Sequence, residues 1–383
     1  MPKRLGIFSI YDPEGIVDEA TFDTLTDLRT CVDYLVVAVN GTVQDPYHDK
    51  LCQIAEKVVV RSNQGFDAGA YKDVLFHHLS SKELQNYDEF ILCNDTFYGP
   101  FVPFREIFSE MEQRGCDFWG LSYSDSPMMQ FLHSYFLCYR AEVFFSCIMP
   151  IFAEHIPVES SDINCIYGYF ERAFFQFPTK KGYHFSCYSS ISNHNLVLYQ
   201  CGNIFMREYN LPVLKKKCFA PELYVEDNVY DALQYISRFY HHDIANIIAS
   251  AKRRYGFSAT VQQVLQAPPR PARYFYRENG IRATDAELND FISRFSSLYI
   301  YGAGYWGQIL YAVFVQPTGK MQGFICSDKA HVPPEGQILG VPVYPLCDIQ
   351  PDDSTGIIVA LGAKNTQQVR PLLNRYPHVF YLY

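Results

Sequence analysis

The stretch EFILCNDTFYGPF, residues 89–101, holds a short apolar run that stops on Asn94 and Asp95. The four residues from Phe90 to Cys93 are typical of a strand buried on both faces, as in a parallel sheet. In open α/β sheets, ligands gather at the carboxyl ends of such strands. A buried carboxylate also needs a partner that offsets its desolvation. Asp95 is therefore a candidate binding residue, and the alternative is a turn residue.

Strands and helices alternate on both sides of this stretch. Apolar runs predict further strands at 5–10, 33–40, 57–62, 117–121 and 134–140. Apolar residues at helical spacing predict helices at 17–28, 70–79 and 103–111. This βαβ succession predicts an α/β fold with a mostly parallel, Rossmann-like sheet covered by helices on both faces.

The proline-rich segment APPRPARY, residues 267–274, divides the chain, because its prolines cannot continue a helix. Before it we expect one domain over 1–266, with a core at 3–220 and a helical extension at 221–266. Residues 267–295 are predicted to be a linker and a helix. A second alternation of strands and helices predicts a small Rossmann-like α/β domain over 296–383.

Composition and charge exclude several classes of protein. The net charge is −9 and no run of Lys and Arg exceeds three residues, as in Lys215–Lys217, which argues against nucleic acid as a partner. This run could still contact a diphosphate or an anionic lipid. No stretch of 18 apolar residues is present, and the first residues lack the apolar region of a signal peptide. The twelve scattered cysteines indicate reduced, buried thiols, and hence a cytoplasmic protein.

A second polar segment, RSNQGFDAGAYKDVL, joins the strand at 57–62 to the following helix. Gly65 allows close approach of a ligand to the backbone, and Asn63 and Asp67 supply polar contacts at a helix N-terminus. The alternative is that Asp67 is an N-cap and Gly65 a turn residue. Together with Asn94, these residues predict a nucleotide site at one edge of the sheet.

Four blocks of the sequence resemble the rhamnan synthesis protein F family, in the right order and spacing. They are NQGFDAGAYK (63–72), YDEFILCNDTFYGPF (87–101), DFWGLSYS (117–124) and HSYFLCYR (133–140). The resemblance extends over residues 3–220. It implies a bacterial glycosyltransferase of the GT-A type, which uses a nucleotide-sugar donor in polysaccharide or lipopolysaccharide synthesis. A glycan or lipid-linked glycan acceptor would add peripheral contact with the inner face of the membrane.

The resemblance also implies a donor site. Many GT-A enzymes have an Asp-x-Asp motif that holds Mg²⁺ or Mn²⁺ on the diphosphate. Here the triplet is Cys93-Asn94-Asp95, with one carboxylate, so Asp95 is the expected metal or sugar contact and strong metal dependence is not expected. Asp12 lies at the end of the first strand, where such folds contact the base or ribose. Its alternative role is that of a turn residue before Pro13.

Transfer to an acceptor hydroxyl needs a general base. The resemblance places Glu171 in this role, with Asp162 as the second candidate; a surface helix residue is the alternative for Glu171. His133 is a candidate contact for the acceptor or sugar, or a structural histidine. Lys215 is expected to neutralise a phosphate, and a solvated basic turn is its alternative.

The resulting prediction is a glycosyltransferase that transfers rhamnose from dTDP-rhamnose to a growing glycan. One alternative comes from YGAGYWG, residues 301–307, which fits a dinucleotide fingerprint between a strand and a helix. It would make the protein a sugar-nucleotide oxidoreductase or epimerase, but only half of a doubly wound fold follows it, and close packing explains its glycines. The third reading is a non-catalytic nucleotide-binding module.

Overall fold

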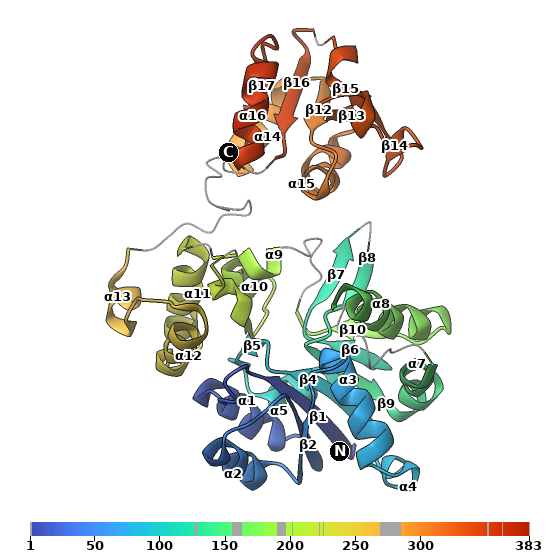
Figure 1. The fold of residues 1–383 in the computed structure, drawn as a ribbon, viewed down its shortest axis with the longest axis vertical. Coiled ribbons are helices and arrows are strands. Elements are labelled where there is room, and N and C mark those ends of the chain that lie inside the picture. The colour runs from blue at the N-terminus through green and yellow to red at the C-terminus, as the bar shows by residue number, and fades with distance from the viewer. Residues whose placement is uncertain are drawn as a thin grey trace. The chain divides into compact units, whose positions relative to one another are not determined.

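A computed structural model describes residues 2–126, 129–154, 163–189, 197–200, 202–221, 223–224, 226–268, 285–350, 352–361 and 363–382. The chain forms two compact units, Met1–Ala272 and Arg273–Tyr383, here called unit 1 and unit 2 (Figure 1). Asp162, one of the two predicted bases, lies outside the described residues.

Unit 1 contains a sheet of seven strands in the order β10-β6-β9-β4-β1-β2-β3. The strands are β1 (Arg4–Tyr11), β2 (Tyr34–Asn40), β3 (Lys57–Arg61), β4 (Glu89–Asn94), β6 (Phe118–Gly120), β9 (Phe136–Arg140) and β10 (Phe185–Cys187). Strands β4, β1, β2 and β3 are parallel, whereas β9 is antiparallel to both β4 and β6. The predicted α/β class with a Rossmann-like sheet is confirmed, with one reversed strand among the parallel ones.

Helices cover both faces of this sheet. A cluster of buried aromatic and aliphatic side chains joins one face to α3 (Phe66–Asp73), α7 (Met149–Glu154) and α8 (Ile163–Lys180). On the other face α5 (Phe104–Gln113) places Phe108 against Trp119 and Phe136, with ring centroids 5.2 and 6.2 Å away. The core therefore lies on the two sides of a sheet whose central strands are fully buried, as their apolar runs predict.

The remaining elements of unit 1 surround this core. They are α1 (Glu19–Arg29), α2 (Asp45–Ile54), α4 (Ser81–Leu84), β5 (Phe97–Tyr98), β7 (Tyr123–Ser126), β8 (Met129–Leu132), α6 (Ala141–Val143), α9 (Val197–Gln200), α10 (Gly202–Glu208) and β11 (Leu214–Lys215). Two pairs among them are antiparallel ribbons, β7 with β8 and β5 with β11.

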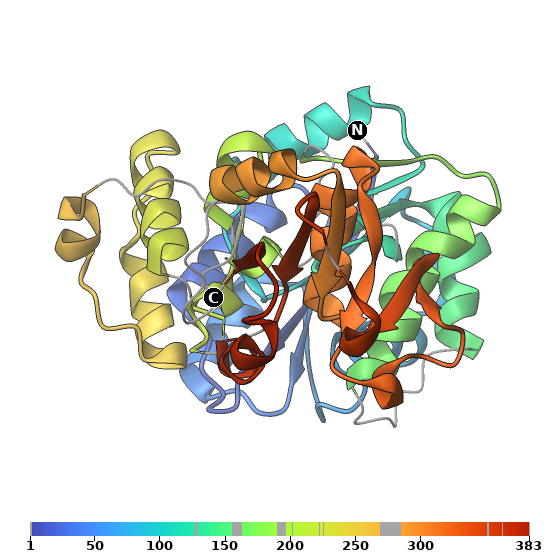
Figure 2. The same cartoon turned by 90° about the horizontal axis from the view of Figure 1, so that it is seen from above.

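The C-terminal part of unit 1 is a helical layer with α11 (Glu226–Phe239), α12 (Ala245–Tyr255) and α13 (Val261–Gln266). The yellow-green α11 and yellow α12 lie side by side in both views (Figures 1 and 2). Their apolar faces share a core cluster with Tyr98 and Leu214 of the β5–β11 ribbon. The helical layer is thus attached to the segment that directly follows Asp95.

Unit 2 has a six-stranded sheet in the order β14-β15-β13-β12-β16-β17. Its elements are α14 (Asp285–Arg294), β12 (Ser297–Tyr301), α15 (Tyr305–Leu310), β13 (Met321–Cys326), β14 (Gln337–Ile338), β15 (Val341–Pro345), β16 (Thr355–Val359), α16 (Ala363–Leu373) and β17 (Val379–Tyr381). All pairs are parallel except β14 with β15.

The glycine-rich turn of unit 2 follows β12. Gly302 has a φ of +103°, and a Cβ on Gly307 would collide with the carbonyl oxygen of Gly302. A Cβ on Gly304 would contact nothing within 4 Å. Two of the three glycines are therefore required by the backbone and by helix–strand packing, which supports the packing explanation of this motif.

The sequence also predicts reduced cysteines and no membrane-spanning segment. Ten of the twelve cysteines are described as free thiols, and seven of these are buried. Among the described helices, none has the length and apolar character needed to cross a bilayer.

Candidate functional site

The carboxyl ends of β1 and β4 lie next to each other. Ser9 is paired in register with Asn94, and the backbone N–H of Asp95 donates to the carbonyl oxygen of Ser9 at 3.0 Å. The chain then continues through β5, which pairs with β11 so that Lys215 lies opposite Phe97. The β5–β11 pairing brings the lysines at 215–217 to the same edge of the sheet as Asp95.

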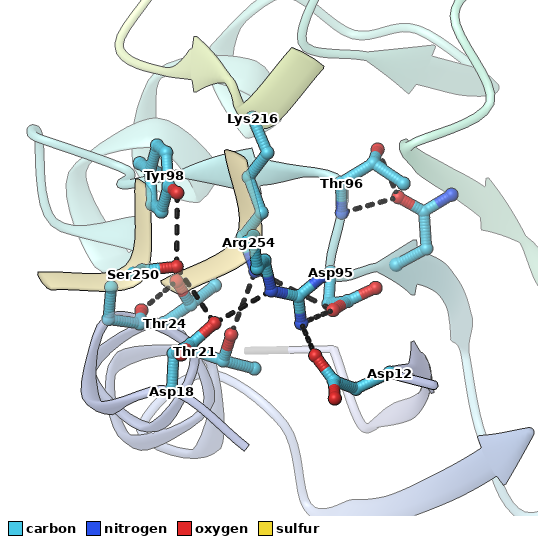
Figure 3. A network of polar contacts seen from close by, with 12 residues as sticks. Asp12, Asp18, Thr21, Thr24, Asp95, Thr96, Tyr98, Lys216, Ser250 and Arg254 are labelled. Atoms are coloured by element: carbon cyan, nitrogen blue, oxygen red, sulfur yellow. Dashed lines mark hydrogen bonds and ion pairs between the residues drawn. The ribbon is translucent and has the colours of Figure 1, made fainter. Parts of the chain in front are cut away.

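Six charged side chains meet at this edge and form what we call the acid–base cluster, most of which is drawn in Figure 3. The cluster consists of Asp12, Asp18, Asp95, Lys216, Arg253 and Arg254. Arg254 is at its centre: Nη2 lies 3.2 Å from Oδ2 of both Asp12 and Asp95, and Nε lies 2.8 Å from Oδ2 of Asp18. Three buried carboxylates thus face three cations, and the exposed Glu14 adds a fourth carboxylate, 3.0 Å from Nη1 of Arg253.

Arg253 and Lys216 complete the pairing. The Nη2 atom of Arg253 lies 2.7 Å from Oδ2 of Asp12, and its Nε lies 2.9 Å from Oδ1 of Asp18. Lys216 places Nζ 3.5 Å from Oδ2 of Asp95 and donates to Oγ1 of Thr21 at 2.9 Å. Its side chain is 3% exposed, and this burial lowers the pKa of Lys216 to about 8 although Asp95 opposes the shift.

Helix α12 positions the arginines of the cluster. Ser250, Arg253 and Arg254 are spaced i, i+3 and i+4, so they lie on one face of the helix. The hydroxyl of Ser250 donates to Oδ2 of Asp18 at 2.8 Å and accepts from the hydroxyl of Tyr98 at 3.0 Å. Burial alone would raise the pKa of Asp18, but its bonds from Arg253 and Ser250 and the charge of Arg254 lower it to about 2.

A second polar network lies beside the cluster and joins the ends of β1 and β4 to the start of α3. Asp67 accepts hydrogen bonds from the hydroxyl of Ser9 at 2.9 Å and from Nδ2 of Asn94 at 2.8 Å. Oδ1 of Asn94 accepts from the hydroxyl of Thr96 at 2.6 Å. Burial, together with the charge of Asp95, raises the pKa of Asp67 to about 6 despite these bonds.

A cavity of about 210 Å³ opens next to this network, and we call it the Lys215 pocket. Its described lining consists of Asn94, Thr96, His133, Ser134, Tyr135, Leu198, Tyr199, Lys215 and Lys217. Nζ of Lys215 donates to the hydroxyl of Thr96 at 2.5 Å and lies 4.2 Å from the ring centroid of Tyr135. The pocket is therefore positively charged, with amide, hydroxyl and aromatic groups around the charge.

His133 borders the pocket on the side of the β7–β8 ribbon. Its Nδ1 lies 2.9 Å from the hydroxyl of Ser122. Burial, followed by the nearby charge of Lys215, lowers the pKa of His133 to about 4. The imidazole is consequently neutral at physiological pH and can accept a proton or a hydrogen bond.

The sequence profile of the family described as rhamnan synthesis protein F matches residues 35–265, more than half of the chain. The chain belongs to the rhamnan synthesis protein F family. The matched region contains the Lys215 pocket and four members of the acid–base cluster, whereas Asp12 and Asp18 precede it. No curated protein matches the sequence significantly.

Several solved structures resemble this family member distantly. They include 4-diphosphocytidyl-2C-methyl-D-erythritol synthase from Anaerococcus prevotii (11% identity, 44% of this chain and 84% of that chain, TM-score 0.26) and mouse xyloside xylosyltransferase 1 (9%, 57% and 99%, TM-score 0.31). A third is core-mannan synthase A from Aspergillus fumigatus in an Mn/GDP form (10%, 39% and 63%, TM-score 0.23). Likenesses at these TM-scores are too slight to support an argument about function.

The structure brings together most of the residues that the sequence singles out. Asp12, Asp67, Asn94, Asp95, His133 and Lys215 all lie at the carboxyl edge of β1 and β4 or on the adjoining pocket. Asn63 and Gly65 lie in the β3–α3 loop, and Glu171 lies within α8. Sequence analysis missed Asp18, Lys216, Arg253 and Arg254. The signal that was available is the Ser250-Arg253-Arg254 spacing, which places three polar side chains on one face of the helix.

Two of the alternatives are resolved by these contacts. Gly65, at a φ of +70°, is the N-cap of α3, so the N-cap alternative for Asp67 is wrong. Asp12 does act as a turn residue, because its Oδ1 accepts from the backbone N–H groups of Glu14 and Ile16 at 3.0 and 3.3 Å. Its other oxygen belongs to the acid–base cluster.

The divalent cation implied by the family resemblance can be tested against the donor atoms around Asp95. Oδ2 of Asp95 is already shared by Lys216 and Arg254, so a metal ion there would face two positive groups. Within the described residues, no three His, Cys, Asp or Glu side chains are grouped so that they could hold a metal. The residues around Asp95 therefore do not fit a divalent ion.

The network around Asp67 predicts a specific pH dependence of stability. Its folded pKa of about 6 lies above the unfolded value of 3.8, so the folded protein binds more protons between these values. Stability should therefore fall as the pH rises from about 4 to about 6, by about 3 kcal/mol from this group. Asp67→Asn should remove that fall, as measured by urea unfolding across this pH range. Asp73→Asn, at the end of the same helix, is the control, and an unchanged pH dependence in Asp67→Asn would contradict the prediction.

Proposed function

We propose that this member of the rhamnan synthesis protein F family is a glycosyltransferase whose nucleotide-sugar donor binds in the Lys215 pocket. The observation that carries the proposal is the position of this pocket. It lies at the carboxyl end of β4, where open α/β sheets bind their ligands, within the region that matches the family.

The chemistry of the pocket suits a sugar nucleotide. The ammonium groups of Lys215 and Lys217 are complementary to a diphosphate. The amide of Asn94 and the hydroxyls around it can bond sugar hydroxyls, and the rings of Tyr135 and Tyr199 offer apolar surface for a sugar or a base. Of the other predicted donor contacts, Asp67 would act by fixing the orientation of Asn94, and Asp12, Asn63 and Gly65 would border the donor.

The transferred sugar, its donor and the acceptor are proposed from the family resemblance. We propose rhamnose as the transferred sugar, dTDP-rhamnose as its donor, and a polysaccharide or lipopolysaccharide precursor as the acceptor, handled in the cytoplasm at the membrane surface. Glu171 is proposed as the general base, with Asp162 second, and His133 as a contact to the acceptor or sugar. The oxidoreductase alternative loses support, because packing explains two of the three glycines in its motif.

A panel of ligands tests this proposal on the full chain. We expect dTDP-rhamnose to raise the melting temperature, since a ligand at 100 times its Kd stabilises the folded state by about 2.7 kcal/mol. It should also be hydrolysed slowly to dTDP in the absence of acceptor. UDP-glucose and GDP-mannose test the choice of donor, and NAD(H) tests the alternative function. Stabilisation by NAD(H) and by none of the sugar nucleotides would contradict the proposal.

A further inference from the structure

We propose that the diphosphate of the donor is bound without a metal ion, by the ammonium groups of Lys215 and Lys217. This inference rests on the proposed function, because it concerns how the same pocket balances the charge of its ligand. It departs from the Asp95-bound cation that the family resemblance implies.

The first argument is that Asp95 is engaged by protein cations. The residue is 6% exposed, and its Oδ2 lies 3.2 Å from Nη2 of Arg254 and 3.5 Å from Nζ of Lys216. Both cations are anchored by further contacts, Arg254 to Asp12 and Asp18 and Lys216 to Thr21. They are therefore held in place, and a divalent ion could bind Asp95 only against their charge.

The second argument is the charge balance of the acid–base cluster. Its three buried carboxylates are matched by two guanidinium groups and one ammonium group, and the exposed Glu14 pairs with Nη1 of Arg253 at the surface. A metal site normally combines a cation with an excess of anionic oxygen ligands. The buried part of the cluster has no such excess, and it links α12 to the ends of β1 and β4 as a structural element.

The third argument is the composition of the Lys215 pocket. Its described lining contains two lysines and no carboxylate. The ammonium group of Lys215 is oriented by the hydroxyl of Thr96 and by the ring of Tyr135. Lysine is a compact point charge that binds phosphate oxygens well. An oriented ammonium can also stabilise the negative charge that develops on the departing diphosphate.

Local structure explains how consecutive lysines reach different sites. Lys215 is the last residue of the strand β11, and a 3₁₀ helix over Lys216–Phe219 begins directly after it. Lys215 enters the pocket, Lys216 enters the acid–base cluster, and Lys217 again lines the pocket. The basic run thus divides between a ligand site and a structural site.

Titration calorimetry of the full chain with dTDP, UDP and GDP tests the inference, once with EDTA and once with Mg²⁺ or Mn²⁺. We expect at least one nucleoside diphosphate to bind in EDTA, with a Kd within about threefold of that measured with metal. Lys217→Ala should weaken this binding about tenfold or more, as for a lost hydrogen bond to a charged group, and Lys217→Arg should restore most of it. Lys217 is exposed, so its replacement should leave the fold intact.

Two further variants sharpen the comparison. Lys215→Met keeps the apolar stem of the side chain and removes the charge, and we expect it to weaken binding at least as much as Lys217→Ala. Lys252→Ala removes one exposed charge from α12, outside the pocket lining, and should bind as the wild type does. Binding that requires Mg²⁺ or Mn²⁺, or that is unchanged in both pocket variants, overturns the inference and leaves the proposed function standing. Absence of binding under every condition overturns both.

Discussion

Replacing Asp95 with asparagine should destabilise unit 1 by about 3 kcal/mol, the lower end of the cost of breaking a buried ion pair. The carboxylate is the only acidic partner that the structure gives to the ammonium of Lys216 within 4 Å among the described residues. Without it, a lysine that is 3% exposed would keep only Thr21 or lose its proton. The cost stays at the lower end because Arg254 retains Asp12 and Asp18. Scanning calorimetry of the full chain at neutral pH measures the change.

Two variants complete this experiment. Asp88→Asn makes the same substitution at an exposed position just before β4 and should leave the melting temperature nearly unchanged. The double variant Asp95→Asn/Lys216→Met removes both charges and should recover most of the lost stability, because a buried pair can often be replaced by apolar groups at little cost. A melting temperature equal to or above that of the wild type in Asp95→Asn alone would show that the carboxylate is a cost to stability, as expected of an unpaired functional residue.

For Asp95, the sequence predicts that the side chain is buried, but it does not predict which groups pair with the carboxylate. The apolar run before it correctly indicates that the carboxylate is buried and needs a partner. The identity of the partner depends on tertiary structure, because Arg254 lies 159 positions later in the chain. No Lys or Arg lies between positions 83 and 104, so the sequence alone favours a metal ion or a sugar as the partner of Asp95. In the structure the partners are Arg254, from α12, and Lys216, and only the tertiary fold brings them next to Asp95.

The fold itself was predictable where local patterns are strong. Apolar runs such as LVVAV and FILC identify β2 and β4, since a doubly buried strand tolerates few polar residues. The apolar pattern of a strand does not indicate whether the strand is parallel or antiparallel to its neighbours, so the antiparallel direction of β9 could not be predicted. Helix α3 continues as a π-helical turn over Val74–His78, which changes the number of residues per turn and which helical spacing alone does not predict. The burial of Tyr71, Val74, Leu75 and Leu79 nevertheless agrees with that spacing.

The residues of the candidate site also fall into two groups, those that the sequence predicts and those whose position depends on the tertiary fold. Residues at the end of a strand or directly after it, such as Asn94 and Asp12, could be placed at the sheet edge, because ligands bind at the carboxyl ends of the strands in open α/β sheets. Lys215 could be identified only by its charge, and its place beside Thr96 depends on the β5–β11 pairing. The pocket residues Ser134, Tyr135 and Tyr199 carry no signal in the sequence that separates them from ordinary core residues.

The largest expected effect on activity is that of Glu171→Gln, which should slow sugar transfer about 10²–10⁴-fold if Glu171 is the general base. The substitution keeps the size of the side chain and removes its ability to accept a proton. Because a general base contacts the acceptor, the Kd of the donor should change little. Single-turnover transfer at saturating donor, together with donor titration, separates the two quantities. Glu142→Gln, an exposed residue after β9, is the matched control.

The rival base within the described pocket is His133, and the two candidates make different predictions. The pKa of His133 is lowered to about 4, so the imidazole is already unprotonated at neutral pH but is a weak base. We therefore expect His133→Gln to slow transfer about tenfold or less, through lost contacts, and to keep the pH profile of the wild type. Glu171→Gln should instead lose the decline of the rate at acidic pH, because the titrating base is gone. If Glu171→Gln transfers sugar within a few-fold of the wild type while His133→Gln loses two orders of magnitude or more, the base lies in the Lys215 pocket and the assignment moves to His133.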